Sequence, residues 1–546
     1  MTPQQIFDKL VEARRGDMSA EHFLQPDYVR DLHDPWLLPD MESAVCRLIE
    51  AKEKDQIVVI YGDYDIDGLT ATTLMLEACE AWGIRAESYI PSRFTEGYGL
   101  NTGAVESIAK KGAELIITVD CGSLSVQEVI TAKQLGVDVI ITDHHTIGDV
   151  LPNAVAVVNP KRKDHTYPNR ELAGVGVAFK FVCAAQQRIE GLTKGAEKWL
   201  LDLVALGTVC DLVPLTGENR VLVHWGLVVA RHNRRLGLSR LYEISGCSPQ
   251  DLRAEDFGFR VGPRLNAAGR MESALASLEL LRTKDSVQAQ QIAEQLEQFN
   301  TARKNEQEEI TKSVLEQAAH DESNILVLAD AEWSHGIVGI VAAKVMRQVK
   351  KPTLIMQIIG DRAKGSARGF GSFDWSKALQ HCGRFLESGG GHQYAAGCSL
   401  LTADLPSFRK ELNSYYGSLQ IGDQSDALTP SVDIDIESPE ILDLEMATLL
   451  DALEPYGQSN PSPLFRISAQ EVTVVRFMGA GEKHCRVLLK SANGSLIESV
   501  HFGRARELKD FIENSPRVDC FVSLEKNHFR GDTTAQLQLV HWESAS

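Results

Sequence analysis

The residues best suited to chemistry in this sequence are three aspartates, Asp63, Asp65 and Asp67, which lie within five positions of one another. They follow an apolar, mostly β-branched run at 57–61, which predicts a buried strand, and they precede a stretch with a helical pattern. Three carboxylates this close repel one another and cannot all be buried without a compensating charge. One reading is an acidic surface turn with a helix cap. Three aspartates at the end of a parallel strand favour a divalent-cation site instead.

Further polar residues stand where other expected elements end. Asp120 follows one apolar run, Asp143, His144 and His145 follow another, and Asp211 ends an apolar helical stretch. Each of these residues taken alone is weak evidence for a functional site, because aspartates often occur in turns. Together with the aspartate triplet they form a set of carboxylates and imidazoles without a thiolate, and that set suits manganese or magnesium.

The stretch from Ile57 to about Asp211 alternates strand patterns with helical patterns, which predicts an α/β fold with a doubly wound, mainly parallel sheet. The expected strands are 57–62, 86–90, 114–119, 138–142 and 154–159. In such a sheet the carboxyl ends of the strands carry the ligand site. The polar residues named above are therefore expected to converge.

Four segments, GDYDIDG, TVDCG, TDHH and VCDLVPL, resemble in order and spacing the four motifs of the DHH phosphoesterase family. Within that family the chain is most similar to its bacterial single-strand-specific 5′→3′ exonucleases. The resemblance implies a DHH catalytic domain, a connecting helix, a smaller α/β DHH-associated domain and a C-terminal β-barrel of the OB-fold.

The resemblance also implies two bound Mn²⁺ or Mg²⁺ ions. The implied ligands are Asp65 and Asp120 for one ion with Asp63 close by, and Asp67, Asp120, His144 and Asp211 for the other. Asp120 would bridge the two ions, and His145 would contact the scissile phosphate or donate a proton. Related phosphatases carry a histidine four residues before Asp65. Tyr61 occupies that position here, so Asp63 or a water molecule is expected to complete the first ion's ligands.

Further along, 257–271 resembles the family stretch that closes the catalytic domain, and SHGIVGIVAAK, 365–374 and 388–400 are together similar to the DHH-associated domain. Glycine-rich backbone next to arginine and serine suits phosphate capture. The expected substrate-binding residues are Tyr98, Arg264, Asn266, Arg270, Ser366, Arg368 and His392. Ser366, Arg368 and Arg264 would hold a 5′-terminal phosphate, and Tyr98 would stack on a base. For Arg264 the alternative is an arginine that pairs with the acidic site for structural reasons, and for Tyr98 it is a loop aromatic that caps the core.

The pattern suggests five parts: a helical lead-in (1–56), the DHH domain (57–283), a connecting helix (284–321), the DHH-associated domain (322–418) and the OB-fold (430–546). The connecting helix is predicted from a run free of Gly and Pro from 286 to 321. The barrel is predicted from five short alternating strands. OB-folds bind single strands through aromatic and basic side chains. The candidates are Phe477, Phe502, Phe529, Trp542, Arg476, Arg486 and Arg530.

Composition narrows the function further. The net charge of −19 argues against a protein that coats duplex DNA, although residues 340–390 are locally basic. The ten cysteines form no CxxC pair, which favours a reducing cytoplasm. No apolar run reaches transmembrane length, and residues 1–10 lack a signal-peptide core, so no membrane partner is expected.

We therefore expect a monomeric, metal-dependent 5′→3′ exonuclease that releases 5′-mononucleotides from single-stranded DNA in recombination and repair. A helicase and a single-strand-binding protein are the expected protein partners. The alternatives are a DHH-family oligoribonuclease or cyclic-dinucleotide phosphodiesterase, and a non-catalytic DHH-fold replication factor. The C-terminal barrel favours long strands, and the full set of acidic and histidine motifs favours catalysis.

Overall fold

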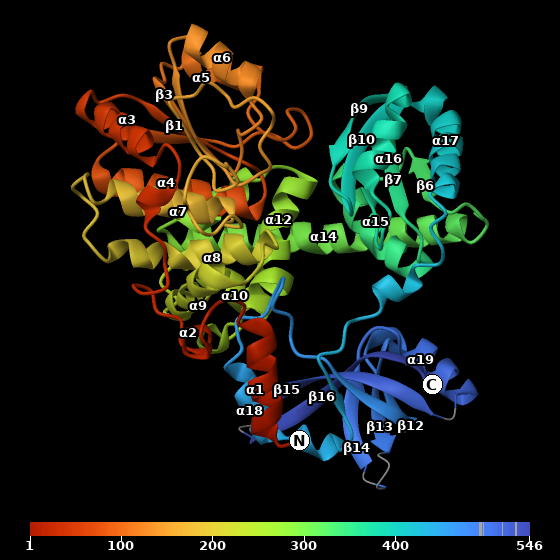
Figure 1. Ribbon diagram of the computed structural model, residues 1–546. Helices are drawn as coiled ribbons and strands as arrows, with labels where there is room; N and C mark the ends of the chain where they lie inside the picture. The colour runs from red at the N-terminus through yellow and green to blue at the C-terminus, as the bar shows by residue number, and fades with distance from the viewer. Residues whose placement is uncertain (491–493, 495, 516, 530–531, 546) are drawn as a thin grey trace. The chain divides into compact units, whose positions relative to one another are not determined.

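The computed structural model describes residues 1–546 except 491–493, 495, 516, 530–531 and 546 (Figure 1). The chain forms two compact units. The first comprises Met1–Pro91, Gly99–Gly262 and Ser431–Ser546, and the second comprises Ser92–Tyr98 and Pro263–Pro430. Within the described residues, none of the helices has the length and apolar character needed to cross a membrane.

The first unit contains a five-stranded sheet, all parallel, in the order β2-β1-β3-β4-β5. Its strands are β1 (Val58–Gly62), β2 (Ala86–Tyr89), β3 (Leu115–Val119), β4 (Asp138–Thr142) and β5 (Ala156–Val158). This confirms the predicted fold class, and each strand lies within two residues of its predicted bounds. Every residue of β1 and β3 is buried because helices cover both faces of the sheet (Figure 1).

The helices on the sheet are α3 (Met41–Glu53), α4 (Ile66–Trp82), α5 (Thr102–Lys110), α6 (Val126–Gln134) and α7 (Gly174–Ala185). The order of the strands reverses at β1, which has β2 on one side and β3 on the other. A crevice outside the carboxyl ends of the strands is expected at such a reversal. The acidic turn after β1 and the aspartate after β3 both lie there.

A helical layer follows the sheet in the chain. It contains η2 (Ala196–Leu200), α8 (Leu201–Cys210), α9 (Gly217–Arg231), α10 (Leu236–Ser245), η3 (Pro249–Asp251), α11 (Ala254–Asp256) and the π-helix η4 (Phe257–Val261). Lys180 on α7 lies 2.5 Å from Glu218 on α9, and both side chains are buried. Glu218 also accepts a hydrogen bond from the hydroxyl of Tyr167 at 2.5 Å. This buried network ties α7 to α9.

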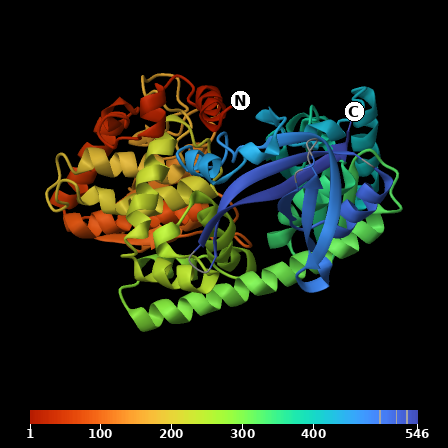
Figure 2. The same cartoon turned by 90° about the horizontal axis from the view of Figure 1, so that it is seen from below.

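The second unit contains α12 (Gly262–Met271), which starts at the boundary, then α13 (Leu275–Arg282) and α14 (Ser286–Ala318). The last is one uninterrupted helix (Figure 2), which confirms the predicted long helix. It has 33 residues and is capped by Asp285. A mixed sheet follows in the order β6-β7-β8-β10-β9. Its elements are β6 (Leu326–Asp330), α15 (His335–Val349), β7 (Thr353–Ile359), β8 (Arg362–Arg368), α16 (Trp375–His381), η5 (Gly383–Phe385), β9 (Leu386–Gly391), β10 (Ala395–Leu401), η6 (Thr402–Asp404), α17 (Leu405–Ser418) and η7 (Ser425–Leu428).

The C-terminal part of the first unit is a barrel, as predicted. Its strands follow the order β11-β12-β13-β14-β16-β15, and pairing of β12 with β15 closes the ring. The elements are β11 (Ile434–Ile436), η8 (Pro439–Ile441), α18 (Leu444–Asp451), β12 (Phe465–Met478), η9 (Ala480–Glu482), β13 (His484–Lys490), β14 (Leu496–His501), α19 (Ala505–Asn514), β15 (Val518–Phe529) and β16 (Asp532–Ser544). A helix between the third and fourth strands of a closed five-stranded ring fits the OB-fold.

The N-terminal segment packs into the core of this barrel. It forms α1 (Pro3–Arg14), α2 (Ala20–Leu24) and η1 (Pro35–Leu37). Ile6, Phe7 and Leu10 of α1 share one apolar cluster with Met446 and Leu450 of α18 and with the barrel strands. No local pattern in the sequence indicates that the first helix packs against strands more than 400 positions away.

A buried arginine joins the helical layer to the barrel. Arg220 on α9 is 1% exposed and donates hydrogen bonds to the carbonyl oxygens of Phe23 at 3.2 Å and Leu453 at 2.9 Å. Its guanidinium also stacks on the ring of Phe23 at 4.0 Å. Burial lowers the pKa of Arg220 to about 10. The barrel is therefore integrated into the first unit through α1, α2 and α9.

We expect Leu10→Ala to destabilise the full chain by about 2–5 kcal/mol, because it leaves a cavity in the core shared by α1 and the barrel. The measurement is the urea midpoint of unfolding. Lys9→Ala, on the exposed side of the same helix, is the matched control and is expected to change little. Equal midpoints for the two variants would contradict the shared core.

Candidate metal centre

The turn after β1 directs its carboxylates in two directions. Asp65 is the N-cap of α4 and accepts a hydrogen bond from the amide of Gly68 at 3.1 Å. Asp67 lies in the first turn of α4 and instead accepts from the amides of Gly174 at 2.6 Å and Val175 at 2.9 Å, at the start of α7. A Cβ at Gly68 would lie 2.5 Å from the carbonyl oxygen of Asp63, so only glycine fits this tight turn. One short turn thus supplies carboxylates to two neighbouring positions.

Asp120 follows β3 with a positive φ of 61°, in the left-handed region that few residues other than glycine adopt. This conformation turns its carboxylate toward the histidines after β4. Asp120 Oδ1 lies 3.2 Å from His144 Nε2 and 3.8 Å from His145 Nδ1. A Cβ at Gly174 would lie 2.6 Å from Asp120 Oδ1, so a glycine there makes room for the carboxylate.

Asp143 orients the two histidines that follow it. Its Oδ1 accepts hydrogen bonds from the amides of His144 at 2.7 Å and His145 at 3.1 Å, and it lies 2.9 Å from His145 Nδ1. Its Oδ2 accepts from the amide of Ser123 at 2.9 Å. Burial alone would raise the pKa of Asp143, but the contact with His145 and these hydrogen bonds hold it below its usual range. Sequence reasoning did not single out Asp143 as a site residue, although its position beside the histidines was a usable signal.

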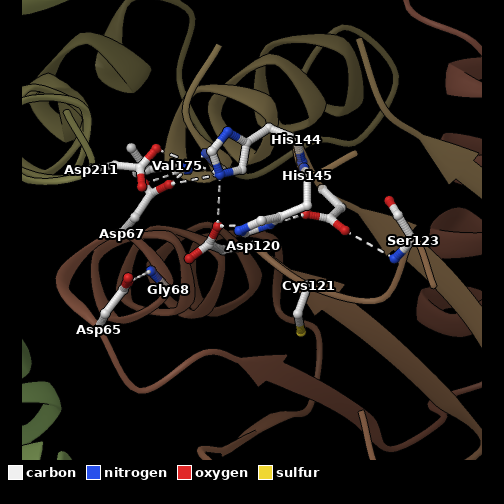
Figure 3. A network of polar contacts seen from close by, with 12 residues as sticks. Asp65, Asp67, Gly68, Asp120, Cys121, Ser123, His144, His145, Val175 and Asp211 are labelled. Carbon is white, nitrogen blue, oxygen red and sulfur yellow. Dashed lines mark hydrogen bonds and ion pairs between the residues drawn. The ribbon is translucent and has the colours of Figure 1, made fainter. Parts of the chain in front are cut away.

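The ring of His144 is surrounded by carboxylates. Its Nε2 lies 3.2 Å from Asp120 Oδ1, 3.6 Å from Asp211 Oδ2 and 3.8 Å from Asp67 Oδ2. Figure 3 shows these three side chains pointing toward the imidazole. Asp211 reaches the site from the C-cap of α8.

Three overlapping groups of potential ligand atoms lie at this centre, and the atoms of each group are within 4.8 Å of one another. The groups are Asp63 with Asp65 and Asp120, Asp67 with His144 and Asp211, and Asp120 with His144 and His145. The structure thus brings together every residue that the sequence suggested for the metals. Asp120 belongs to two of the groups, as a bridging ligand would.

The electrostatics of the site favour bound cations. Burial, followed by the neighbouring carboxylates, raises the pKa of Asp67 to about 7, that of Asp211 to about 9 and that of Asp120 well above its usual range. Burial also lowers the pKa of His144 to about 3, so its imidazole is neutral and able to act as a ligand. Both nitrogens of that ring are buried, and Nε2 faces three carboxylates. Divalent cations would relieve the repulsion, and this oxygen and nitrogen donor set fits Mn²⁺ or Mg²⁺.

Tyr61 packs as a structural residue rather than as a metal ligand. It is fully buried, donates a hydrogen bond from its hydroxyl to the carbonyl oxygen of Gly99 at 2.9 Å, and stacks on Tyr89 with ring centroids 5.1 Å apart. Asp63 is 3% exposed and groups with Asp65 and Asp120. Asp63 is therefore placed to complete the first set of ligands.

The second unit brings Ser366 and Arg368 of β8 to the first turns of α15. A Cβ at Gly339 on α15 would lie 3.3 Å from both Ser366 Oγ and Arg368 Nη2. Burial lowers the pKa of Arg368, and no described carboxylate lies within ion-pair distance of it. Burial together with the charges of Lys364 and Arg93 lowers the pKa of His335 to about 4. Cationic side chains therefore gather at the N-terminus of α15, which favours an anion.

The other expected substrate residues occupy different surroundings. Arg264 on α12 forms a 2.5 Å ion pair with Glu297 of α14, a carboxylate outside the acidic site that the sequence suggested as its structural partner. Arg270 donates to the carbonyl oxygen of Gly336 at 3.0 Å and so borders the start of α15. Asn266 is half-buried on the same helix. Exposed residues complete the set: Tyr98 is 51% exposed, and His392 lies in the turn between β9 and β10.

The barrel residues suggested for strand binding divide into core and surface. Trp542 is 8% exposed and Phe477 is half-buried against the core. Phe502 is 50% exposed, Arg476 is exposed, and Arg486 forms a 3.3 Å ion pair with Glu498. Arg530 and the side chain of Phe529 lie outside the described residues.

Comparison with known families assigns three parts of the chain. The DHH family, N-terminal domain, matches residues 57–208, and the DHHA1 domain matches 322–418. The RecJ OB domain matches 432–541. The metal centre lies in the first of these matches, apart from Asp211, which follows it by three residues.

Two curated relatives are similar over nearly the whole chain. The single-stranded-DNA-specific exonuclease RecJ of Bacillus subtilis is 36% identical over 517 residues, which cover 93% of this chain and 64% of that protein. The protein of the same description from Dickeya dadantii is 35% identical over 541 residues, which cover 94% of this chain and 92% of that protein.

Solved structures agree with this similarity. RecJ from Thermus thermophilus in complex with Mn²⁺ matches with a TM-score of 0.83 and 28% identity, over 98% of this chain and 76% of that chain. The structure of the same protein in complex with Mg²⁺ matches with a TM-score of 0.77 and 27% identity, over 98% and 74%. Both ions are those that the donor set fits.

We expect Mn²⁺ to stabilise the unsubstituted chain and Asp120→Asn to abolish this stabilisation, because the shared ligand loses its charge. In EDTA the variant is expected to unfold at an equal or higher temperature, since one source of carboxylate repulsion is gone. Asparagine tolerates the positive φ of this position. Asp149→Asn, a nearby exposed aspartate, serves as the control. A variant that is stabilised by Mn²⁺ as strongly as the unsubstituted chain would refute the bridging position.

Proposed function

The chain belongs to the RecJ family of single-stranded-DNA-specific exonucleases, and we propose that it degrades single-stranded DNA in the 5′→3′ direction, releasing 5′-mononucleotides by phosphodiester hydrolysis. The observation that carries this proposal is the cluster of carboxylates and imidazole around His144, with Asp120 common to two ligand groups. The RecJ OB match supports long strands over the dinucleotide and oligoribonucleotide alternatives. The complete ligand set argues against a non-catalytic scaffold.

When bound, two divalent cations supply the acidity that activates water and stabilises charge on the attacking and leaving oxygens. Asp63, Asp65 and Asp120 would hold one ion, and Asp67, Asp120, His144 and Asp211 would hold the other. The amides at the start of α7 fix the direction of Asp67, which keeps the two sets apart.

His145 is the residue proposed to contact the scissile phosphate. Asp143 holds its Nδ1 at 2.9 Å, which leaves Nε2 directed away from that carboxylate. The side chain is 39% exposed, whereas that of His144 is 6% exposed, so His145 is the one accessible to a substrate. The contact between Asp143 and the imidazole raises the pKa of His145 despite burial, which favours a cationic ring that suits an anionic phosphate.

Ser366 and Arg368 are the proposed ligands of a 5′-terminal phosphate. The free charge of Arg368, the hydroxyl of Ser366 and the amides at the start of α15 offer a charge-assisted site for a phosphate dianion. Holding a terminal phosphate would select which end of a strand is presented, and so it would set the polarity. Arg264 is left out of this role because Glu297 already pairs with it. Arg270, Asn266, His392 and Tyr98 stay as predicted contacts of the strand.

Further along the strand, the barrel is the proposed binding surface. Phe502 and Arg476 are its exposed aromatic and basic candidates. Because α1 shares the core of the barrel, point variants test this role better than a truncation at Pro430, which would uncover Ile6 and Phe7.

The proposed setting is recombination and repair in a reducing cytoplasm, where the protein would act as a monomer. All ten cysteines are free thiols, and most are buried, which suits that compartment. A helicase that unwinds duplex and a single-strand-binding protein are the proposed protein partners, because both would act on the same strand.

We expect the protein to convert a 5′-phosphorylated DNA strand to mononucleotides with Mn²⁺ or Mg²⁺, and to lose this activity in EDTA or as Asp120→Asn. The measurement is product length on a strand labelled at the 5′ end, followed over time, with Asp149→Asn as the active control. A paired blunt duplex is expected to resist. Labelled strands that shorten progressively, in place of a labelled mononucleotide released at once, would contradict the proposed polarity.

We expect Arg368→Ala to weaken binding of a 5′-phosphorylated strand about ten- to a hundredfold, because a charge-assisted hydrogen bond is worth roughly 1.5–3 kcal/mol. It should also remove most of the preference for a 5′-phosphate over a 5′-hydroxyl. The measurement is the ratio of degradation rates on those two ends. Arg347→Ala, an exposed arginine near the other end of α15, is the matched control.

An equal loss on both ends would show that Arg368 serves the scissile phosphate or the fold. A ratio that matches the unsubstituted protein would remove Arg368 from the pocket altogether.

A further inference from the structure

Leu212, which directly follows Asp211, has a backbone conformation that its side chain does not favour. Its φ is +62°, a left-handed value that is a genuine outlier for a bulky residue. Its side chain is 69% exposed and takes no part in the core. Strain of this kind persists where the surrounding structure enforces it, and it is concentrated at functional sites. A glycine would satisfy this turn without strain, so packing does not account for a leucine here.

The π-helix η4 packs against the same segment of chain. Cys210 Sγ donates to the carbonyl oxygen of Phe257 at 3.5 Å. A Cβ at Gly262, just after η4, would lie 2.7 Å from Cys210 Sγ and 3.2 Å from Ile66 Cδ1. Cys210 precedes Asp211, and Ile66 lies between Asp65 and Asp67. The π-helix therefore packs against side chains of the two segments that carry three of the proposed metal ligands. Single-turn π-helices occur frequently at functional sites.

This π-helix exposes a large aromatic side chain. Phe259 is 83% exposed, while Phe257 and Val261 in the same turn are fully buried and hold the helix in place. Two apolar side chains, Leu212 and Phe259, thus face solvent from two segments that pack together beside the metal centre. Each is costly to leave in water.

We propose that Phe259 and Leu212 form an apolar platform that receives an unpaired base of the nucleic-acid strand whose scissile phosphate lies at the metal centre. This inference rests on the proposed exonuclease function and deepens it, because it names residues that contact bases rather than phosphates. An aromatic ring on a short helix offers a face for stacking, and Leu212, next to Asp211 in the chain, is the second exposed apolar side chain.

The platform would contribute to selectivity for single strands. A base in a duplex is paired and stacked on both faces, so it cannot lie on a protruding aromatic ring without first leaving the helix. An unpaired base has a free face, and stacking on an aromatic side chain tolerates every base. The side chains would therefore favour unpaired strands without reading their sequence.

The test uses the full-length protein with Mn²⁺, 5′-phosphorylated strands, and the variants Phe259→Ala, Phe259→Trp and Leu212→Gly. Stacking of one base corresponds to about a five- to hundredfold effect on KM. Phe259→Ala is expected to raise KM by that factor, and Phe259→Trp to restore it. Leu212→Gly is expected to raise KM without lowering the unfolding temperature, since glycine relieves the positive φ. Leu135→Ala, an exposed apolar residue at the C-cap of α6, is the control.

A second set of substrates carries one abasic residue at successive positions from the 5′ end. At the position that meets the platform, the missing base is expected to raise KM for the unsubstituted protein, and there Phe259→Ala is expected to add no further loss. If Phe259→Ala raises KM by the same factor on every abasic strand, no base rests on it and the inference fails. It fails also if Leu212→Gly unfolds several degrees lower, because the leucine then serves the fold.

Failure of the proposed function has a separate signature. If the unsubstituted protein degrades none of the strands, the exonuclease proposal itself is wrong. If it degrades them and both Phe259→Ala and Leu212→Gly match Leu135→Ala in KM, the exonuclease stands and the platform is refuted.

Discussion

Repulsion among buried carboxylates is the constraint on which the rest of the catalytic region depends. Asp63, Asp67 and Asp120 are almost fully buried, and Asp65 and Asp211 lie beside them. A folded chain that holds these groups together without cations must protonate some of them, and the raised pKa values of Asp67, Asp120 and Asp211 express that cost. The fold therefore makes metal binding favourable in advance, because an ion relieves a strain that is already present.

The backbone around the metal centre is arranged to bring these groups close. Asp120 and Leu212 adopt positive φ values, and the glycines at 68 and 174 leave room where a Cβ would collide with a neighbouring residue. The start of α7 contributes two amides to Asp67, and Asp143 contributes one carboxylate to both histidine amides. These contacts act on residues that would bind metal or substrate, and they explain why polar groups at separate strand ends reach a common centre. The strained backbone at Asp120 and Leu212 accompanies this close arrangement of polar groups.

The barrel is connected to the catalytic sheet by packing as well as by sequence. The guanidinium of Arg220 bonds to backbone carbonyls of two segments, and α1 fills part of the barrel core. A buried arginine without a carboxylate partner is destabilising unless its donors are satisfied, so the carbonyls of Phe23 and Leu453 must stay in place. This coupling makes the barrel a fixed part of the first unit and gives the N-terminal helix a structural role.

Local sequence patterns determined the parallel sheet, the long helix α14, the barrel and the set of candidate metal ligands. They could do so because strand and helix periodicity is local, and because parallel strands deliver their carboxyl ends to one edge. Tertiary structure alone decided that Arg264 pairs with Glu297 and that α1 joins the barrel, because each contact joins segments whose pairing leaves no periodic signal. The exposure of Phe259 and Leu212 belongs to the same class. In the sequence an apolar residue is read as core, and only the packing of its neighbours reveals that it faces solvent.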